Sequence, residues 1–190
     1  MIVVIDTSSL LALVRYYGRF DKTNKMQSML KTKIENGEIV VVDEVLNECK
    51  GTSKGIVIKQ MNYLDDKEWK KEFKVPFNTS SLIAPAPQRF MNQVDNNFKA
   101  PGAKKLSAEL YEVRKREFLE SADMKMIIYC LNQKHKNPDL DIRIVTEETD
   151  TPNDNKAFKK IPLICKILNI KVSTLPEYLD EIDDINLVFN

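Results

Sequence analysis

Four acidic residues stand where their side chains could act together on a cation. Asp6 ends the apolar run Ile2–Ile5, and Glu148 follows a later apolar run. Glu48 and Asp123 lie near the starts of two segments with helical patterns. Carboxylates that lie close together repel one another, so such a group needs a cation between its members. Ligand sets made only of oxygen favour Mg²⁺ or Mn²⁺, which are therefore the expected cofactors.

Each of these acids also has an ordinary structural explanation. Asp6 could simply cap the helix that follows it, since Asp is a common capping residue. Glu48 could be a solvated helix acid, and Asp123 could favour the positive end of its helix. Glu148 could belong to a solvated loop. The set of four is more informative than any single member.

Three further acids are alternates for the same roles. Glu44 lies one helical turn before Glu48 and shares its face of the helix. Glu147 and Asp150 flank Glu148 and could replace it. The sequence leaves these alternatives open.

The segments that must position the acids alternate between two patterns. Strands are expected at residues 2–6, 39–42, 142–146 and 170–172, with helical patterns between them. Such alternation predicts right-handed crossovers and a parallel sheet covered on both faces. We therefore expect an α/β fold, a three-layer αβα sandwich with a mostly parallel central sheet. Strand ends and helix starts share one edge of such a sheet, which would bring the four acids together.

The middle of the chain has a different character. From about residue 51 to 120 no strong strand pattern occurs, and segments 61–74 and 90–98 have helical spacing. We expect one domain spanning residues 1–190, with a helical and loop insertion on one edge of the sheet.

Composition narrows the classes of partner. The chain has 190 residues and a net charge of +1, so no overall positive field attracts nucleic acid. Binding of that kind would need local basic patches, although charge runs are more often solvated faces. The candidate residues are Lys70, Lys71, Lys104, Lys105, Arg114 and Arg116.

The cysteines and the chain start favour a cytoplasmic protein. Cys49, Cys130 and Cys165 are odd in number and far apart, which predicts reduced core residues. Asp6 interrupts the first apolar run, so a signal peptide is not expected. No charge-free stretch reaches the length of a membrane span.

The order of these motifs resembles the PIN domain superfamily of metal-dependent nucleases. The chain starts with a strand followed by Asp6-Thr7-Ser8-Ser9, and an acid follows in Val45-Leu46-Asn47-Glu48. A helix start at Ala122-Asp123 and a strand followed by Thr146-Glu147-Glu148 complete the series. The resemblance covers roughly residues 1–50 and 120–180. It extends to a less-studied bacterial PIN-like group whose last motif carries Glu.

The resemblance implies a function and roles for individual residues. The protein would be a metal-dependent endoribonuclease that hydrolyses phosphodiester bonds in RNA. Asp6, Glu48, Asp123 and Glu148 would be the catalytic residues and the ligands of Mg²⁺ or Mn²⁺. Thr7 or Ser8 would orient Asp6, and Thr146 would orient Glu148.

The resemblance also suggests partners. Single-stranded or structured RNA would be the substrate. If the protein is the toxin of a bacterial toxin–antitoxin pair, an antitoxin protein is a second partner. A homodimer is left open, and no membrane partner is expected.

Two departures from the family pattern support an alternative. Nuclease members usually carry Thr-x-Asp where this chain has Thr146-Glu147-Glu148, and the insertion is longer than in compact toxins. The alternative is a degenerate PIN-like module that binds RNA or protein without cleavage. A haloacid-dehalogenase phosphatase would need a second Asp where Ser8 stands. A receiver domain usually has adjacent acids before its first helix and a lysine late in the chain. Neither this class nor the phosphatase is favoured by the sequence.

Overall fold

The computed structural model describes residues 1–151 and 155–182. At its centre is a four-stranded sheet in which every pair of neighbouring strands is parallel, in the order β2-β1-β3-β4. The strands are β1 (Ile2–Ile5), β2 (Ile39–Val40), β3 (Ile142–Val145) and β4 (Lys171–Ser173). The predicted α/β fold with a parallel central sheet is confirmed.

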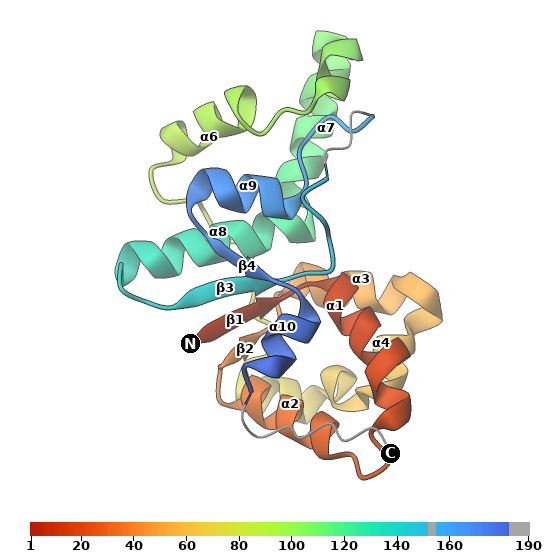
Figure 1. Ribbon diagram of the computed structural model, residues 1–190. Helices are drawn as coiled ribbons and strands as arrows, with labels where there is room; N and C mark the ends of the chain where they lie inside the picture. The colour runs from red at the N-terminus through yellow and green to blue at the C-terminus, as the bar shows by residue number, and fades with distance from the viewer. Residues whose placement is uncertain (152–154, 183–190) are drawn as a thin grey trace.

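Helices cover both faces of this sheet (Figure 1). In that view α8 and α9 lie above the sheet, while α2 and α10 lie below it. The α-helices are α1 (Thr7–Ala12), α2 (Lys25–Glu35), α3 (Asp43–Gly51), α4 (Ile56–Gln60), α5 (Lys67–Phe73), α6 (Pro87–Asn96), α7 (Ala108–Glu120), α8 (Ala122–Lys136), α9 (Ile161–Leu168) and α10 (Leu175–Asp180). This arrangement is the predicted three-layer αβα sandwich. No described helix is long and apolar enough to span a membrane.

The buried strands explain the continuous apolar runs in the sequence. Val3, Val4 and Ile5 of β1 are all buried, because helices pack on both faces of the strand. The three cysteines are also buried and free, as predicted.

The second strand is shorter than predicted and gains an unexpected neighbour. After Val40 the chain leaves β1, and the backbone N–H of Phe77 donates to Val41 O at 2.9 Å. The N–H of Asp43 then donates to Phe77 O at 3.0 Å. A residue of the insertion thus supplies the backbone partner that β1 does not, and the prediction of a full strand through Val42 is wrong.

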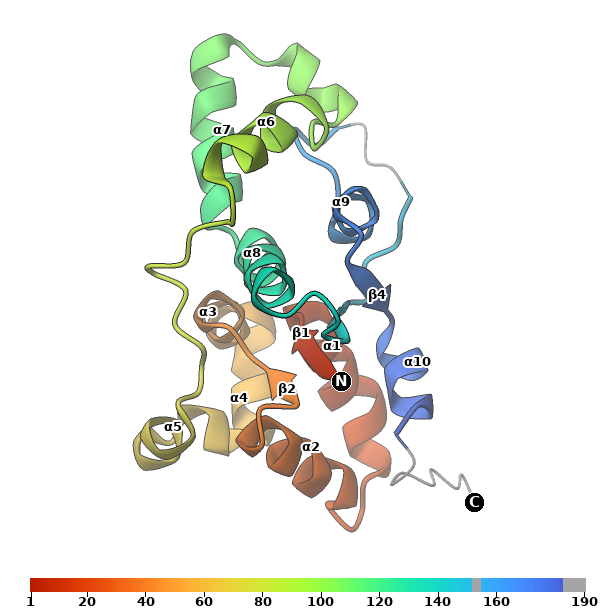
Figure 2. The same cartoon turned by 90° about the vertical axis from the view of Figure 1, so that its left-hand side faces the viewer.

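The insertion is mainly helical, as expected, but it is divided between two ends of the molecule. Figure 2 shows α5 at the bottom and α6 with α7 at the top, joined by an extended segment. The expected helix at 61–74 is interrupted, because Asp66 caps a new helix by accepting the N–H of Trp69 at 2.7 Å. Trp69 Nε1 also donates to Glu35 Oε1 at 2.7 Å, which fixes α5 against the end of α2.

The upper part of the insertion is tied to the segment that precedes α9. Lys99 and Phe158 form an antiparallel bridge, and the ring of Phe158 stacks on Phe118 with centroids 4.1 Å apart. The short helix η5 (Pro101–Lys105) begins beside this bridge. A Cβ atom on Gly102 would collide with the backbone oxygen of Lys156, so only glycine allows this close approach.

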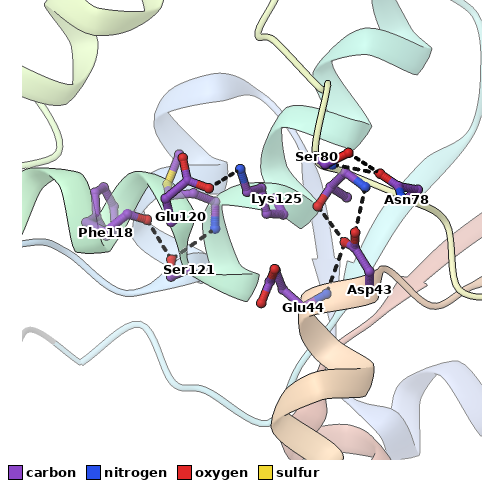
Figure 3. A network of polar contacts seen from close by, with 10 residues as sticks. Asp43, Glu44, Asn78, Ser80, Phe118, Glu120, Ser121 and Lys125 are labelled. Carbon is purple, nitrogen blue, oxygen red and sulfur yellow. Dashed lines mark hydrogen bonds and ion pairs between the residues drawn. The ribbon is translucent and has the colours of Figure 1, made fainter.

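The extended segment between α5 and α6 is anchored at the start of α3 (Figure 3). Asp43 accepts the backbone N–H of Thr79 at 2.9 Å and its hydroxyl at 2.5 Å. Thr79 is only 1% exposed, so both of its polar groups depend on this carboxylate.

Replacing Asp43 with Ala should therefore destabilise the protein by about 2–3 kcal/mol, since two buried donors lose their acceptor. Urea unfolding followed by circular dichroism measures this difference in the free energy of unfolding. Asp139→Ala, an exposed acid before β3, is the matched control and should change stability little. Equal losses in both variants would contradict the anchoring role of Asp43.

Candidate functional site

Asp6 directly follows β1, at the carboxyl ends of the parallel strands. Two hydroxyl groups hold its buried carboxylate there. Ser8 Oγ donates to Asp6 Oδ2 at 2.5 Å, and Thr146 Oγ1 donates to the same oxygen at 2.8 Å. These hydroxyls in turn accept the backbone N–H groups of Glu147 and Glu148, at 3.0 Å and 3.1 Å. Hydrogen bonds linked in this way polarise one another. The turn after β3 therefore fixes the orientation of Asp6.

Glu48 approaches Asp6 from α3. Thr7 Oγ1 donates to Glu48 Oε2 at 2.7 Å, which contradicts the expected role of Thr7 at Asp6. Thr7 faces α3 because it is the first residue of α1, and these two helices are in contact. Ser8 takes the role at Asp6 that the sequence left open between the two residues.

Neighbouring groups shift the acidity of Glu48. Although much of the residue is exposed, loss of hydration around its carboxyl group is the largest cause of a raised pKa. The hydrogen bond from Thr7 opposes this rise, whereas the charges of Asp6 and Glu44 add to it. Glu48 is thus close enough to Asp6 for their charges to interact.

The starts of α3 and α8 lie side by side (Figure 3). Ser121 caps α8, since its Oγ accepts the N–H of Met124 at 3.4 Å. The same Oγ donates to Phe118 O at 2.7 Å. Glu44 points toward the space between the two helix starts, and Asp123 lies in the first turn of α8.

Asp123 connects the four acids electrostatically. The pKa of Asp123 is raised to about 7. Burial is the largest cause, followed by the charges of Asp6, Glu148 and Glu48 in that order. Lys156 acts in the opposite direction. Charges shift a pKa in this way only when they are near neighbours. The other three acids that the sequence analysis selected are therefore near enough to Asp123 for their charges to affect it.

Glu148 joins the group from the turn after β3. Its Oε2 accepts the backbone N–H of Ile161, the first residue of α9, at 3.1 Å. The expectation that Thr146 orients the Glu148 carboxylate is wrong. Thr146 Oγ1 instead accepts the backbone N–H of Glu148 and donates its own proton to Asp6.

The three alternates lie in different surroundings. Glu44 stays beside Glu48 and shifts its pKa. Glu147 turns toward α10, where its Oε1 accepts the backbone N–H of Leu175 at 2.7 Å. Asp150 is exposed and is not among the charges that shift the pKa of Asp123. Glu44 is therefore a rival of Glu48, while Glu147 has a structural role.

Each of the four acids keeps an oxygen that accepts no hydrogen bond from the described residues. Hydrogen bonds from described residues reach Asp6 Oδ2, Glu48 Oε2 and Glu148 Oε2. Among these residues, none donates to the second oxygen of those groups or to either oxygen of Asp123. Free carboxylate oxygens are the donors that Mg²⁺ and Mn²⁺ prefer, so the donor set fits such an ion.

The acids do not, however, form a ready-made cage. In the part of the chain that the structure describes, no three His, Cys, Asp or Glu side chains are grouped closely enough to hold an ion. Hydrogen bonds hold Glu48 on Thr7 and Glu148 on Ile161. We therefore expect Mg²⁺ or Mn²⁺ to require rotation of these two longer side chains.

A cleft of about 510 Å³ opens beside Asp123 and Glu148. The segment before α9 and the helix α7 supply its basic side chains, which are Arg114, Lys156, Lys159 and Lys160. Arg114 Nη1 lies 2.8 Å from Glu117 Oε2. Acidic and basic groups thus share one cleft, which suits a ligand that carries phosphate groups and needs a cation.

The basic residues selected from the sequence fall into two groups. Lys70 and Lys71 lie on α5, at the opposite end of the molecule from α6 and α7 (Figure 2). Lys70 Nζ is 3.4 Å from Asp65 Oδ1. Lys70 and Lys71 therefore do not lie at the acidic cleft, because the hydrogen bond from Trp69 to Glu35 holds α5 against α2.

The other predicted basic residues belong to the upper part of the insertion. Arg114 lines the acidic cleft, and Lys104 and Lys105 end η5. Arg116 is two residues beyond Arg114, which is about 200° around a helix, so it faces away from the cleft.

Sequence reasoning missed Lys156 and Lys160, both of which line the cleft. Three lysines occur within residues 155–160, shortly after Glu148 and just before the helix-starting Pro162. Their position after the fourth acidic motif was the signal that could have revealed them.

Comparison with known proteins establishes the family. A family model described as a domain of unknown function, DUF4411, matches residues 3–184, and the chain therefore belongs to that family. The match includes the insertion as well as all four acidic motifs. Neither a search of curated proteins nor a search of solved structures gave a match.

Replacing Asp123 with Asn removes a negative charge that burial and the neighbouring acids destabilise. With a chelator present, we expect the variant to be about 1–3 kcal/mol more stable than the parent near pH 8. The folded-state pKa of about 7 lies above that of the unfolded chain. The parent therefore keeps the full stability from protonated Asp123 only below about pH 4 and loses it as the pH rises through 7.

The advantage of the Asn variant should consequently shrink as the pH falls from about 8 to about 5. Urea unfolding at both pH values measures it, with Asp139→Asn as the control. A constant difference across this range would mean that the charge of Asp123 is not under strain.

Proposed function

We propose that this protein is a PIN-like, metal-dependent endoribonuclease. The observation that carries the proposal is the placement of the acids. Asp6 and Glu48 are held by hydroxyls at the start of α1, and Asp123 and Glu148 line one cleft. The raised pKa of Asp123, about 7, agrees with this placement. Acids from four separate segments weaken the fold when they converge without counter-charge. Such destabilising arrangements are expected at functional sites, where residues are selected for their chemistry rather than for stability.

Asp6, Glu48, Asp123 and Glu148 would hold the ion through their free oxygens. Bound Mg²⁺ or Mn²⁺ lowers the pKa of an attached water and neutralises charge on a phosphodiester. The protein itself orients the acids with uncharged groups, since Ser8 and Thr146 hold Asp6. Hydroxyl donors of this kind fix a carboxylate without cancelling the negative charge that a cation requires.

The basic wall of the cleft supports a phosphate-containing substrate. Lys156 and Lys160 line the same cleft as Asp123 and Glu148, and their positive charges would attract a phosphate backbone. The choice of RNA over DNA rests on the resemblance to PIN-like ribonucleases. The same resemblance supports a role as the toxin of a toxin–antitoxin pair.

A second candidate function is a PIN-like module that binds RNA without cutting it. Two observations favour it. The acids are not grouped as a ready-made metal site within the described residues, and one oxygen of Glu148 is engaged by the start of α9. Activity and metal binding separate the two candidates.

The parent protein should cleave single-stranded RNA when Mn²⁺ is added. Asp6→Asn should reduce the rate by roughly two orders of magnitude or more, because the amide keeps the hydrogen bonds but loses the charge that binds the ion. Gel electrophoresis of a labelled RNA gives the rates. Asp139→Asn makes the same chemical change before β3, at the amino ends of the strands, and should leave the rate unchanged.

Metal binding can be tested without catalysis. Adding Mn²⁺ should raise the melting temperature of the parent by mass action, and raise that of Asp6→Asn much less. Thermal melts with chelator and with Mn²⁺ measure this difference. A metal-dependent rise without any cleavage would favour the binding module, whereas the absence of both effects would remove the metal site.

A further inference from the structure

A second hollow adjoins the acidic cleft, and we call it the lysine pocket. It has a volume of about 730 Å³ and lies between the end of α6, the short helix η5 and the start of α7. Its cationic residues are Lys99, Lys104 and Lys159, and none of the described residues that line it is acidic. It differs in this from the acidic cleft, which both acidic and basic side chains line.

The two hollows share part of their lining. Leu106 and Lys159 line both the acidic cleft and the lysine pocket. A ligand that starts beside Asp123 and Glu148 can therefore continue into the lysine pocket over a shared boundary. The combined surface runs from Asp123 and Glu148 to a region whose charged lining residues, in the described part of the chain, are lysines.

The frame of the lysine pocket is held in place by backbone contacts. Ala100 N donates to Ala157 O, and Lys159 N donates to Phe98 O, both at 2.9 Å. Gly102 allows η5 to lie directly against the segment that carries Lys156. The lysines of the two hollows therefore belong to one connected frame rather than to separate loops.

The charges in the lysine pocket are available to a ligand. Lys99 Nζ lies 4.2 Å from the ring centroid of Tyr111. Lys104 is exposed, and Lys159 Nζ donates to the backbone oxygen of Asn97 at 2.5 Å. Among the described residues none of these three ammonium groups forms an ion pair within 4.0 Å. Cations left without acidic partners favour an anionic ligand.

We propose that the lysine pocket binds the phosphate backbone of a single strand of nucleic acid whose neighbouring phosphate lies at the four acids. This proposal deepens the proposed function and rests on it. The partly buried ring of Tyr111 lines this basic groove, and a basic groove with aromatic side chains is a usual combination in proteins that bind single strands. A free phosphate would fill one hollow, whereas only a chain of phosphates uses both.

The test is a binding measurement in chelator, where no metal-dependent cleavage occurs. The probe is a fluorescein-labelled single-stranded RNA of about twelve nucleotides, followed by fluorescence anisotropy over a range of salt concentrations. The variant Lys99→Ala with Lys104→Ala should bind about tenfold more weakly, and its salt dependence should fall by roughly one to two phosphate contacts. The control, Lys67→Ala with Lys71→Ala on α5, should bind as the parent does.

A charge-preserving variant separates electrostatics from folding. Lys99→Arg with Lys104→Arg keeps both positive charges and should bind like the parent. Unchanged binding of the alanine variant would overturn the proposal, and so would loss of binding in the arginine variant. The proposal would also be overturned if inorganic phosphate displaced the RNA at a concentration equal to that of the phosphate groups in the RNA. A single phosphate would then suffice for binding.

The two proposals fail in different ways. If the alanine variant loses salt-dependent binding but the parent never cleaves RNA, the lysine pocket stands and the nuclease proposal fails. If the parent cleaves RNA in Mn²⁺ but binding does not depend on Lys99 and Lys104, the nuclease proposal stands and the lysine pocket fails.

Discussion

The parallel pairing of β1 with β3 is the constraint on which the site depends. It aligns Ile5 with Val145, so the residues that follow the two strands leave the sheet together. Asp6 then meets the hydroxyl of Thr146, although 140 positions separate them in sequence. A shift of one residue would turn every side chain of β1 to the other face and would separate this pair.

The central sheet and the insertion contribute side chains of opposite charge to the acidic cleft. The residues after β1 and β3, together with the helices α3 and α8, supply four acids, which repel one another. The upper part of the insertion and the segment before α9 supply lysines. Lys115 pairs with Asp95, whereas Lys99, Lys104 and Lys159 form no ion pair with a described acid. Asp123 lies where these contributions meet, because the charges of three acids and of Lys156 all affect its pKa. Neither half would form the site alone.

Sequence patterns predicted the elements well and their contacts less well. The apolar run before Asp6 was enough to predict a buried strand with an acid at its end. Thr7 and Ser8 could not be assigned to partners, because this depends on how α1 packs against α3. The position of α5 depends on a bond between Trp69 and Glu35, and such a pairing over 34 residues leaves no periodic signal. The lysines before α9 join the site for a similar reason, through backbone contacts with the insertion.

Gly102 couples two parts of the chain that look independent in sequence. Any larger residue there would push away the segment around Lys156, so a change at one position demands a compensating change at the other. In relatives of this protein, the residue at this point and the length of the connection to α9 should therefore vary together. For protein engineering, the insertion cannot be trimmed as an appendage. Its upper part and the acidic core are expected to open and close as one cooperative unit.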